Sequence, residues 1–448
     1  MITRSSGVIL VCGTRSIESL LASNYGIRHK ALPQLAMEPR IIFIESNTSG
    51  TGRLFALTAR RMGLDPLLIT DNPDRYPYVQ QDDIEYLRYP CSDSIEGLDR
   101  TIAGIAEKIE VVGICSSSEY FIEAAAELAQ RRGLPGPEPD AVRSCRNKWL
   151  QYESLRMADV GVPHSRCVNS TEEALRTLNF MPLPVVLKPV SGTGSMGVRL
   201  CRTRAEVEVQ ATELLRVTTN ERGIPVPQEL LVQEYIQWPE FSAEMFCGQL
   251  VGITRKHVSA VPYFVETGHD FPVKVSGHRL KHVTAALQRA AREIRMCWGP
   301  IHVEFRWQMD DLVIMEINPR LAGGFIPELV RLSTGIDLVE QTMRLAAGRK
   351  THLTPTIDRY ASIRFVRPQL EGVIAGFKGL ENAISVRDVV DVQAYKTPGV
   401  SFCFRHDFRD RIGHVISCGT SQQAALSAAR KAIDLIEVEM TSANLVPV

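Results

Sequence analysis

The chain has 448 residues, 44% of them hydrophobic and 23% charged, and its 51 basic and 51 acidic residues leave a formal net charge of zero. This composition is typical of a globular protein with two to four units. Without a basic run, nucleic acid and anionic membranes are not expected as partners, and no apolar stretch reaches the roughly 20 residues that span a bilayer. Ten cysteines are scattered singly, so we expect thiols in a reducing cytoplasm.

The first part of the chain alternates strand and helix patterns. Residues 1–40 are expected to be an N-terminal extension, whose apolar stretch we interpret as a first strand and not as a signal peptide. Further elements are expected as strands at Ile41–Glu45, Leu67–Thr70 and Val111–Cys115, with helices ending at Arg61 and spanning Glu119–Arg132. This order predicts a parallel sheet, which the Pro/Gly-rich GLPGPEP at 133–139 closes.

Two loops at strand ends of this part could contact a ligand. Gly50 and Gly52 in SNTSGTG could let backbone N–H groups approach a phosphate at a helix start. Strand-to-helix turns also need glycine, and contact with a small substrate is a further alternative. The serines at 116–118 end another strand, where ligands of open sheets bind, but ordinary helix capping is the favoured interpretation for them.

A second glycine-rich segment follows the predicted strand Val185–Pro189. Lys188 lies near the end of that strand, and SGTGSMGV follows at 191–198. Its glycines allow backbone N–H groups to approach phosphate oxygens, and the lysine adds a mobile cation. The segment is not a P-loop, because its lysine precedes the glycines. Alone, it is weak evidence for phosphate binding.

The most informative segment is Ile301–Val330, IHVEFRWQMDDLVIMEINPRLAGGFIPELV. Two apolar runs around QMDD predict a hairpin, and alternation places Glu316, Asn318 and Arg320 on one face, with Glu304 opposite. Two carboxylates and an amide oxygen suit Mg²⁺ that bridges phosphates, and arginine can hold a transferring phosphoryl group or an oxyanion. Such residues could be solvated surface, but they lie among Ile, Val, Met and Phe. A phosphoryl-transfer site is therefore the better interpretation.

Other polar residues are ambiguous one by one. Lys148 opens a predicted helix and could be a solvated lysine. The strand-like run Glu229–Tyr235 contains Glu234, which could contact an adenine, and Glu240 on the next run could accept from ribose hydroxyls. A carboxylate at a strand end is more often surface than ligand.

Together these motifs resemble the ATP-grasp superfamily in order and spacing: Lys148, Lys188 with SGTGSMG, QEYI, Glu240, and the pair HVEF and MEINPR. Within it, the chain looks like the carboxylate–amine ligases typified by bacterial L-amino acid ligases. SNTSGTG, GLPGPEPDAV, FVETGHDFP and EINPRLAGGFIPELV all match that subgroup. The resemblance covers residues 41–440 and is strongest at EINPR.

The resemblance implies an ATP-grasp fold of mixed α/β and α+β units. The expected parts are an N-terminal extension at 1–40, a parallel α/β substrate-side domain at 41–140, an ATP-grasp small or lid region at 141–235, a large catalytic region at 236–354, and a C-terminal α+β domain at 355–448 with a helix at Gln422–Met440.

The resemblance also implies roles for single residues. ATP would be bound by Lys148, Lys188, Ser191, Gly192, Gly194, Ser195, Gly197, Gln233, Glu234, Tyr235, Ile236, Glu240 and Lys256. Two Mg²⁺ ions, with Mn²⁺ as a substitute, would be held by Glu304, Glu316 and Asn318. The catalytic residues would be Arg320, Lys188, Glu266 and His269.

In this subgroup the ETGH segment faces the amino acid substrates. Glu266 could recognise a substrate ammonium, and His269 could contact a carboxylate or the transferring phosphate; the alternative is that 262–275 is a surface loop. Lys256, between Arg255 and His257, belongs to a basic cluster near the expected phosphate end.

The implied reaction is ATP-dependent amide or peptide bond formation through an acyl phosphate, with release of ADP and phosphate. Amino acids or small carboxylates would be the substrates, and a homodimer is expected by family analogy. One alternative is a carboxylase that uses carboxyphosphate, which the ETGH segment disfavours. Another is a nucleotide-binding protein without turnover, which would have no need for the complete Glu/Glu/Asn/Arg set. The glycines after Arg320 hint at room for a larger acyl donor, but they leave the substrates open.

Overall fold

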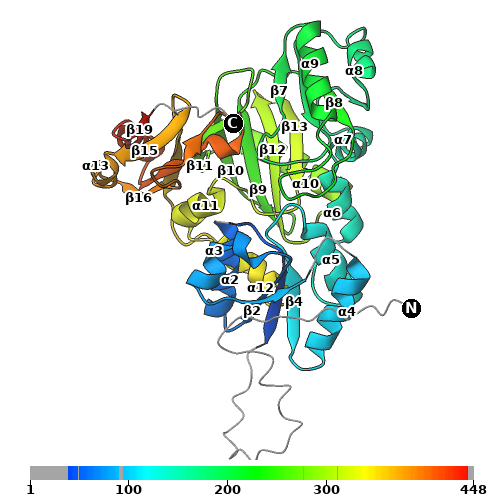
Figure 1. Cartoon of the computed structure of the whole chain (residues 1–448), viewed down its shortest axis with the longest axis vertical. Helices are drawn as coiled ribbons and strands as arrows, with labels where there is room; N and C mark the ends of the chain where they lie inside the picture. Colours follow the sequence, from blue (N-terminus) through cyan, green and yellow to red (C-terminus); the bar gives the residue numbers. More distant parts are fainter. Residues whose placement is uncertain (1–38, 49, 90–93, 276, 310, 442–448) are drawn as a thin grey trace, which may run out of the picture. The chain divides into compact units, whose positions relative to one another are not determined.

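The computed structural model describes residues 39–48, 50–89, 94–275, 277–309 and 311–441 (Figure 1). The predicted extension and its first strand, at 1–38, lie outside the described residues. The rest forms two compact units, each with its own core. The first contains the described residues up to Arg143 together with Leu338–His352, and the second contains Ser144–Asp337 and the described residues from Leu353.

The first unit is a parallel four-stranded sheet in the order β3-β2-β1-β4, as the sequence predicted. Its strands are β1 (Arg40–Ile44), β2 (Asp65–Thr70), β3 (Glu85–Arg88) and β4 (Val111–Cys115). Its helices are α2 (Thr51–Arg61), η2 (Pro73–Arg75), α3 (Pro77–Gln81), α4 (Ile95–Ala106), α5 (Ile122–Arg131) and α12 (Leu338–Ala346). Helix α2 packs against α12, and α4 packs against α5 on the other side of the sheet (Figure 1). All five residues of β1 are buried, because both faces of the sheet are covered.

Helix α12 returns to this unit from far along the sequence. It packs on α2 and on β4, where Gly113 lies against the carbonyl of Ala346 so closely that any Cβ would overlap it. The domain boundaries expected from the sequence place this helix in the catalytic region at 236–354. A single amphipathic helix carries no local signal of which unit it will join.

The two candidate loops of this unit are joined to each other. Ser117 Oγ lies 2.8 Å from Ser46 Oγ and accepts from the N–H of Asn47 at 3.0 Å. Helix α5 has Phe121 at its N-cap and no capping side chain. The alternative that the serines at 116–118 cap this helix is therefore wrong, because Ser117 holds the neighbouring loop instead.

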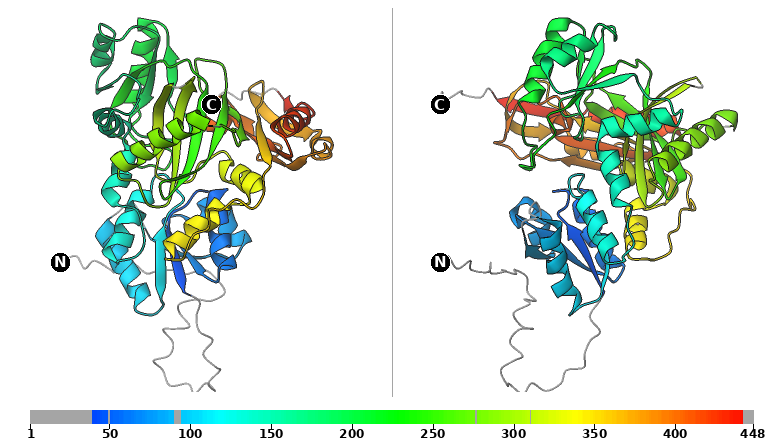
Figure 2. Two further views of the ribbon diagram at one scale, coloured as in Figure 1. Left: turned by 180° about the vertical axis from the view of Figure 1, so that it is seen from behind. Right: turned by 90° about the vertical axis from the view of Figure 1, so that its right-hand side faces the viewer.

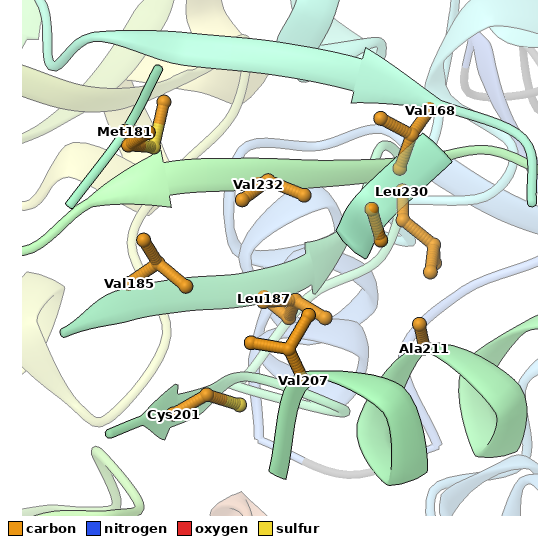
Figure 3. Packing of buried hydrophobic residues seen from close by; sticks show 10 residues of the cluster. Val168, Met181, Val185, Leu187, Cys201, Val207, Ala211, Leu230 and Val232 are labelled. Carbon is orange, nitrogen blue, oxygen red and sulfur yellow. The ribbon is translucent and has the colours of Figure 1, made fainter. Parts of the chain in front are cut away.

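The second unit contains a small antiparallel sheet in the order β5-β8-β6-β7. Its strands are β5 (Ser165–Val168), β6 (Val185–Pro189), β7 (Arg199–Cys201) and β8 (Leu230–Glu234), accompanied by α6 (Pro139–Arg146), which begins in the first unit, and by α7 (Lys148–Met157), α8 (Thr171–Thr177) and α9 (Arg204–Leu215). Figure 3 shows Leu187 of β6, Val232 of β8 and Val207 of α9 in one core. Because side chains alternate along a strand, the burial of Leu187 here turns Lys188 to the opposite face.

The large sheet of the second unit has eight strands in the order β13-β12-β9-β10-β11-β14-β18-β16. They are β9 (Glu240–Phe246), β10 (Gln249–Val258), β11 (Glu266–Phe271), β12 (Pro300–Gln308), β13 (Asp311–Asn318), β14 (Tyr360–Val366), β16 (Val389–Ala394) and β18 (Gly413–Gly419), with α10 (Gly277–Glu293), α11 (Ile326–Thr334), α13 (Leu380–Ile384), η3 (Phe408–Asp410) and α14 (Gln422–Ile433). The predicted hairpin is confirmed as β12–β13. Of the C-terminal strands, β14, β18 and β16, among those coloured orange in Figure 2, continue the sheet of the green strands, so this part of the C-terminal region is built onto the catalytic sheet.

The predicted helix Gln422–Met440 is wrong in its last part. Helix α14 ends at Ile433, and Glu437–Thr441 forms β19, which pairs with β15 (Gly372–Lys378) beside β17 (Ser401–Phe402). The sequence EVEMT alternates charged and apolar residues, so its apolar side chains pack on a small core while the glutamates face outward. The short alternating pattern directly follows a strongly helical stretch, and the predicted helix was therefore extended through it.

Each described cysteine is a free thiol. In the part of the chain that the structure describes, no helix has the length and apolar character needed to cross a membrane.

The core behind Lys188 gives a direct test of the fold. Leu187→Ala should destabilise the protein by about 2–5 kcal/mol, because it removes a fully buried side chain. Leu370→Ala, at a site that is 67% exposed, is the matched control and should change stability by less than about 0.5 kcal/mol. Urea unfolding of both variants measures the difference; equal effects would contradict this packing.

Candidate active site

One face of the large sheet gathers polar side chains from neighbouring strands. Glu304 on β12 is paired with Glu316 on β13 and with Ser242 on β9, and His302 is paired with Asn318. Paired residues and alternate residues along a strand share a face, so these side chains lie together. We call this set the polar face; it comprises Glu240, Ser242, Glu244, Thr254, Lys256, Glu266, His269, His302, Glu304, Arg306, Glu316 and Asn318.

A bulge adds the ETGH segment to the polar face. Lys256 is paired with His269, but the register then shifts, so that Val258 is paired with Glu266. Glu266 and His269 are three residues apart and yet lie on the same side. His269 Nε2 is 3.6 Å from Glu266 Oε2, and neither ring nitrogen has a hydrogen-bond partner among the described residues. Burial lowers the pKa of His269, although the Glu266 carboxylate opposes that shift, so burial favours the neutral imidazole.

Lys256 is the central charge of the polar face. Its Nζ lies 2.7 Å from Glu304 Oε1, 2.9 Å from Glu266 Oε1 and 3.2 Å from Glu240 Oε1, and 2% of its side chain is exposed. Burial opposes the charge of Lys256, but the three carboxylates outweigh it and hold its pKa well above the ordinary value. Burial likewise opposes ionisation of Glu266 and Glu304, yet the ammonium keeps the pKa of each well below its usual range.

The three predicted metal ligands lie next to one another. Glu304 and Glu316 are opposite each other on paired strands, and Asn318 is two residues beyond Glu316. Within the described ranges, no group of three or more His, Cys, Asp or Glu is arranged to hold a metal ion. Two carboxylates and one amide oxygen are nevertheless hard donors of the kind that Mg²⁺ prefers, and they would form only part of its ligand set. Metal binding by these residues stays a prediction.

Two lysines line the predicted phosphate end of the site. Lys148, at the start of α7, places its Nζ 3.1 Å from Glu316 Oε1 and donates to the carbonyl of Gly192 at 2.9 Å. Lys188 donates to Tyr152 Oη at 2.7 Å. Burial lowers the pKa of Lys188 to about 8, although the nearby carboxylates oppose that shift. Both lysines thus approach the face that carries the predicted metal ligands.

The glycine-rich segment 191–198 closes this end. Ser191 and Gly192 are half-buried, and Gly197 is exposed. Arg320 Nη2 donates to Thr193 Oγ1 at 3.0 Å, which ties the predicted oxyanion-binding arginine to the segment. Ser195 Oγ donates to the carbonyl of residue 264 at 3.1 Å. The segment therefore has side-chain hydrogen bonds with Arg320 and with the 262–264 loop.

The predicted adenine region lies at the end of β8. Gln233 is fully buried, and its Oε1 has no hydrogen-bond partner among the described residues. Glu234 Oε1 accepts from the backbone N–H of His164 at 2.7 Å. This hydrogen bond engages one oxygen of the carboxylate, and adenine contact by Glu234 stays a prediction. Tyr235 and Ile236 are half-buried beside it.

The structure adds residues that the sequence analysis missed. His302 Nδ1 lies 3.0 Å from Glu244 Oε2, and its Nε2 lies 3.2 Å from Glu304 Oε1. Burial opposes protonation of His302, but these carboxylates raise its pKa to about 9. Alternation from Glu304 could have found this histidine. Arg306 donates to Glu240 Oε2 at 2.8 Å, so the predicted ribose ligand is held by an arginine as well as by Lys256.

Arg411 was also missed, and no local signal could have found it. Its Nη1 donates to Glu266 Oε2 at 2.8 Å, although it lies in the C-terminal region, far from ETGH in sequence. A pairing of this kind arises only when β14 and β18 join the large sheet.

Known protein families match two parts of the chain. An ATP-grasp domain matches residues 181–328, and the L-amino acid ligase C-terminal domain 2 matches residues 364–441. Together these segments contain the glycine-rich segment, the whole polar face, and Arg411.

Individual proteins resemble larger parts of it. The uncharacterized protein y4rH of Sinorhizobium fredii is 31% identical over 90% of this chain and 83% of its own length. Carnosine synthase 1 of Gallus gallus is 29% identical over a segment that covers 56% of this chain and 28% of that relative's own length. The crystal structure of an L-amino acid ligase from Bacillus licheniformis has a TM-score of 0.75 and 19% identity, over 91% of this chain and 100% of that one, and shows the shared fold.

The matched domains, the high coverage of y4rH and the shared fold agree with the resemblance seen in the sequence. The chain therefore belongs to the ATP-grasp superfamily, as a carboxylate–amine ligase of the group that carries the L-amino acid ligase C-terminal domain.

Proposed function

We propose that this enzyme joins the carboxylate of one substrate to the amine of an amino acid, forming a dipeptide or amino acid amide through an acyl phosphate. The observation that carries the proposal is the polar face, on which Lys256 connects the Glu304 end to the Glu266 end within hydrogen-bonding distances. A phosphoryl-transfer end and an amino-acid end are thereby adjacent. The names of the relatives, carnosine synthase and L-amino acid ligase, agree with such substrates.

The first step activates the carboxylate. One carboxylate oxygen attacks the γ-phosphorus of ATP, the bond to the β-phosphate oxygen breaks, and ADP leaves. Lys148 and Lys188 bind the phosphates, and Arg320 holds the acyl phosphate as charge accumulates. Mg²⁺ held by Glu304, Glu316 and Asn318 would neutralise phosphate charge when bound. Two ions, and Mn²⁺ as a substitute, remain part of the proposal.

The second step forms the amide. The neutral amine attacks the acyl carbon, and the carbonyl oxygen becomes an oxyanion that Arg320 stabilises. The carbonyl then re-forms, the bond to the phosphate oxygen breaks, and the proton lost by the nitrogen leaves with the phosphate. Glu266 recognises the substrate ammonium, since an ionised buried carboxylate is complementary to that charge. The neutral His269, with unpartnered ring nitrogens, contacts the substrate carboxylate or the phosphate. A homodimer stays a prediction.

The direct experiment measures phosphate release from Mg·ATP with pairs of amino acids and small carboxylates, combined with mass spectrometry. We expect release that requires a particular pair, and a product lighter than the pair by one water. Release that requires bicarbonate would favour a carboxylase instead, and nucleotide binding without any release would favour a binding protein.

Glu316 tests the metal-binding assignment. Glu316→Gln should reduce turnover by roughly a hundredfold or more, because it removes a charged oxygen ligand while the fold is kept. Glu328→Gln is the control and should retain activity, because the partly exposed Glu328 side chain of α11 forms an ion pair with Arg331. Steady-state kinetics and thermal unfolding measure both; near-normal turnover of Glu316→Gln would remove this residue from the metal site.

Lys188 predicts how nucleotide binding depends on pH. Its pKa of about 8 means that the ammonium is lost as pH rises above that value, whereas bound phosphates favour the charged form. The Kd for Mg·ATP should therefore be constant below pH 8 and rise by up to about tenfold for each pH unit above it. Lys188→Arg keeps its charge and should remove the dependence. Calorimetric titrations that give equal slopes for both proteins would contradict the assignment.

A further inference from the structure

The C-terminal region contributes a loop that the reaction scheme does not use. We call residues 405–411 the C-terminal loop. Asp410 is fully buried and accepts from the backbone N–H groups of Arg405 at 2.8 Å and His406 at 3.0 Å. Asp407, also buried, caps the short helix η3 at the centre of the loop. These internal hydrogen bonds fix the loop in one conformation.

Phe408 of this loop lies against the glycine-rich segment. Its N–H donates to the carbonyl of Gly194 at 3.2 Å. A Cβ at Gly194 would overlap the ring of Phe408, and Gly194 has a φ of +65°. Glycine is therefore favoured at this position both by the backbone conformation and by the ring of Phe408, which lies against it.

Other contacts strengthen this closure. The ring of His406 stacks on Tyr263 with centroids 3.7 Å apart and planes at 2°. Residue 264, next to Tyr263, accepts the hydrogen bond from Ser195 of the glycine-rich segment. The C-terminal loop, the 262–264 loop and the glycine-rich segment thus contact one another in turn.

The same loop also binds the amino-acid end of the site. Arg411 donates from Nη1 to Glu266 Oε2 at 2.8 Å and from Nε to the carbonyl of Phe408 at 3.1 Å. Its guanidinium lies 4.4 Å from the ring centroid of Phe365, and 12% of its side chain is exposed. Arg411 therefore connects the predicted ammonium-binding carboxylate to the residue that covers Gly194.

We propose that the C-terminal loop is a latch that couples the amino-acid end to closure of the glycine-rich segment over the phosphates. Phe408 and Arg411 are positioning residues, which act through Gly194 and Glu266. The proposal rests on the proposed function, because the latch protects the acyl phosphate. If water reaches that intermediate, it attacks the acyl carbon, the phosphate leaves, and the carboxylate is regenerated without an amide.

The test compares phosphate released with amide formed. The wild-type protein should give a ratio near one, and Phe408→Ala should raise it by roughly three- to tenfold, because the loosened segment admits water. Gly194→Ala disturbs the same contact from the other side and should act alike. Phe180→Ala, at a site that is 80% exposed, is the control and should keep the ratio of the wild type.

Arg411 is tested by a conservative pair of variants. Arg411→Met removes the charge that holds Glu266, and should raise both the KM for the amino acid and the phosphate-to-amide ratio. Arg411→Lys keeps a cation and should restore part of each. An effect limited to thermal stability, with both readouts unchanged in Phe408→Ala and Arg411→Met, would overturn the proposal.

A second measurement does not depend on amide formation. Stopped-flow release of Mg·ATP should be faster from Phe408→Ala than from the wild type, since the latched segment slows release of the nucleotide. An equal rate would overturn the latch even if the ligase reaction is confirmed. If the wild type releases nucleotide slowly but forms no amide from any pair, the proposed function fails while the latch is retained.

Discussion

The buried ammonium of Lys256 among three carboxylates is the interaction on which the site depends. Glu240, Glu266 and Glu304 would repel one another without it, and removing one partner of such a buried group typically costs about 3–5 kcal/mol. The same contacts fix the distance between the Glu304 end and the Glu266 end of the site, because the Lys256 side chain contacts both carboxylates. The charge balance and the geometry of the polar face therefore have a common origin.

Strand register is what brings these residues together. The ladders from β13 to β9 align Glu316, Glu304 and Ser242 on one face. On the other side of the same strands, Ala243, Val303 and Ile317 are buried. A bulge then turns Glu266 toward Lys256. On the small sheet, the same alternation buries Leu187 and directs Lys188 away from the core. In both sheets, therefore, the two-residue repeat of a strand determines which face carries the charged side chains.

Sequence reasoning succeeded where the pattern is local and failed where it depends on long-range pairing. The β12–β13 hairpin follows from alternation and a short turn, and so does the shared face of Glu304 and Glu316. Arg411 reaches Glu266 only because β14 and β18 extend the catalytic sheet. No local sequence pattern predicts that these strands pair with this sheet. Helix α12 joins the first unit for the same kind of reason, and the predicted helix beyond Ile433 was wrong because a strand partner became available.

Oxygen transfer from the carboxylate to phosphate tests the account most directly. A carboxylate substrate labelled with ¹⁸O in both oxygens is incubated with the enzyme, Mg·ATP and the amine, and the phosphate is analysed by mass spectrometry. An acyl phosphate predicts one ¹⁸O in each phosphate released and one in each amide. Unlabelled phosphate beside labelled amide would contradict phosphoryl transfer to the carboxylate, and with it the chemistry assigned to the polar face.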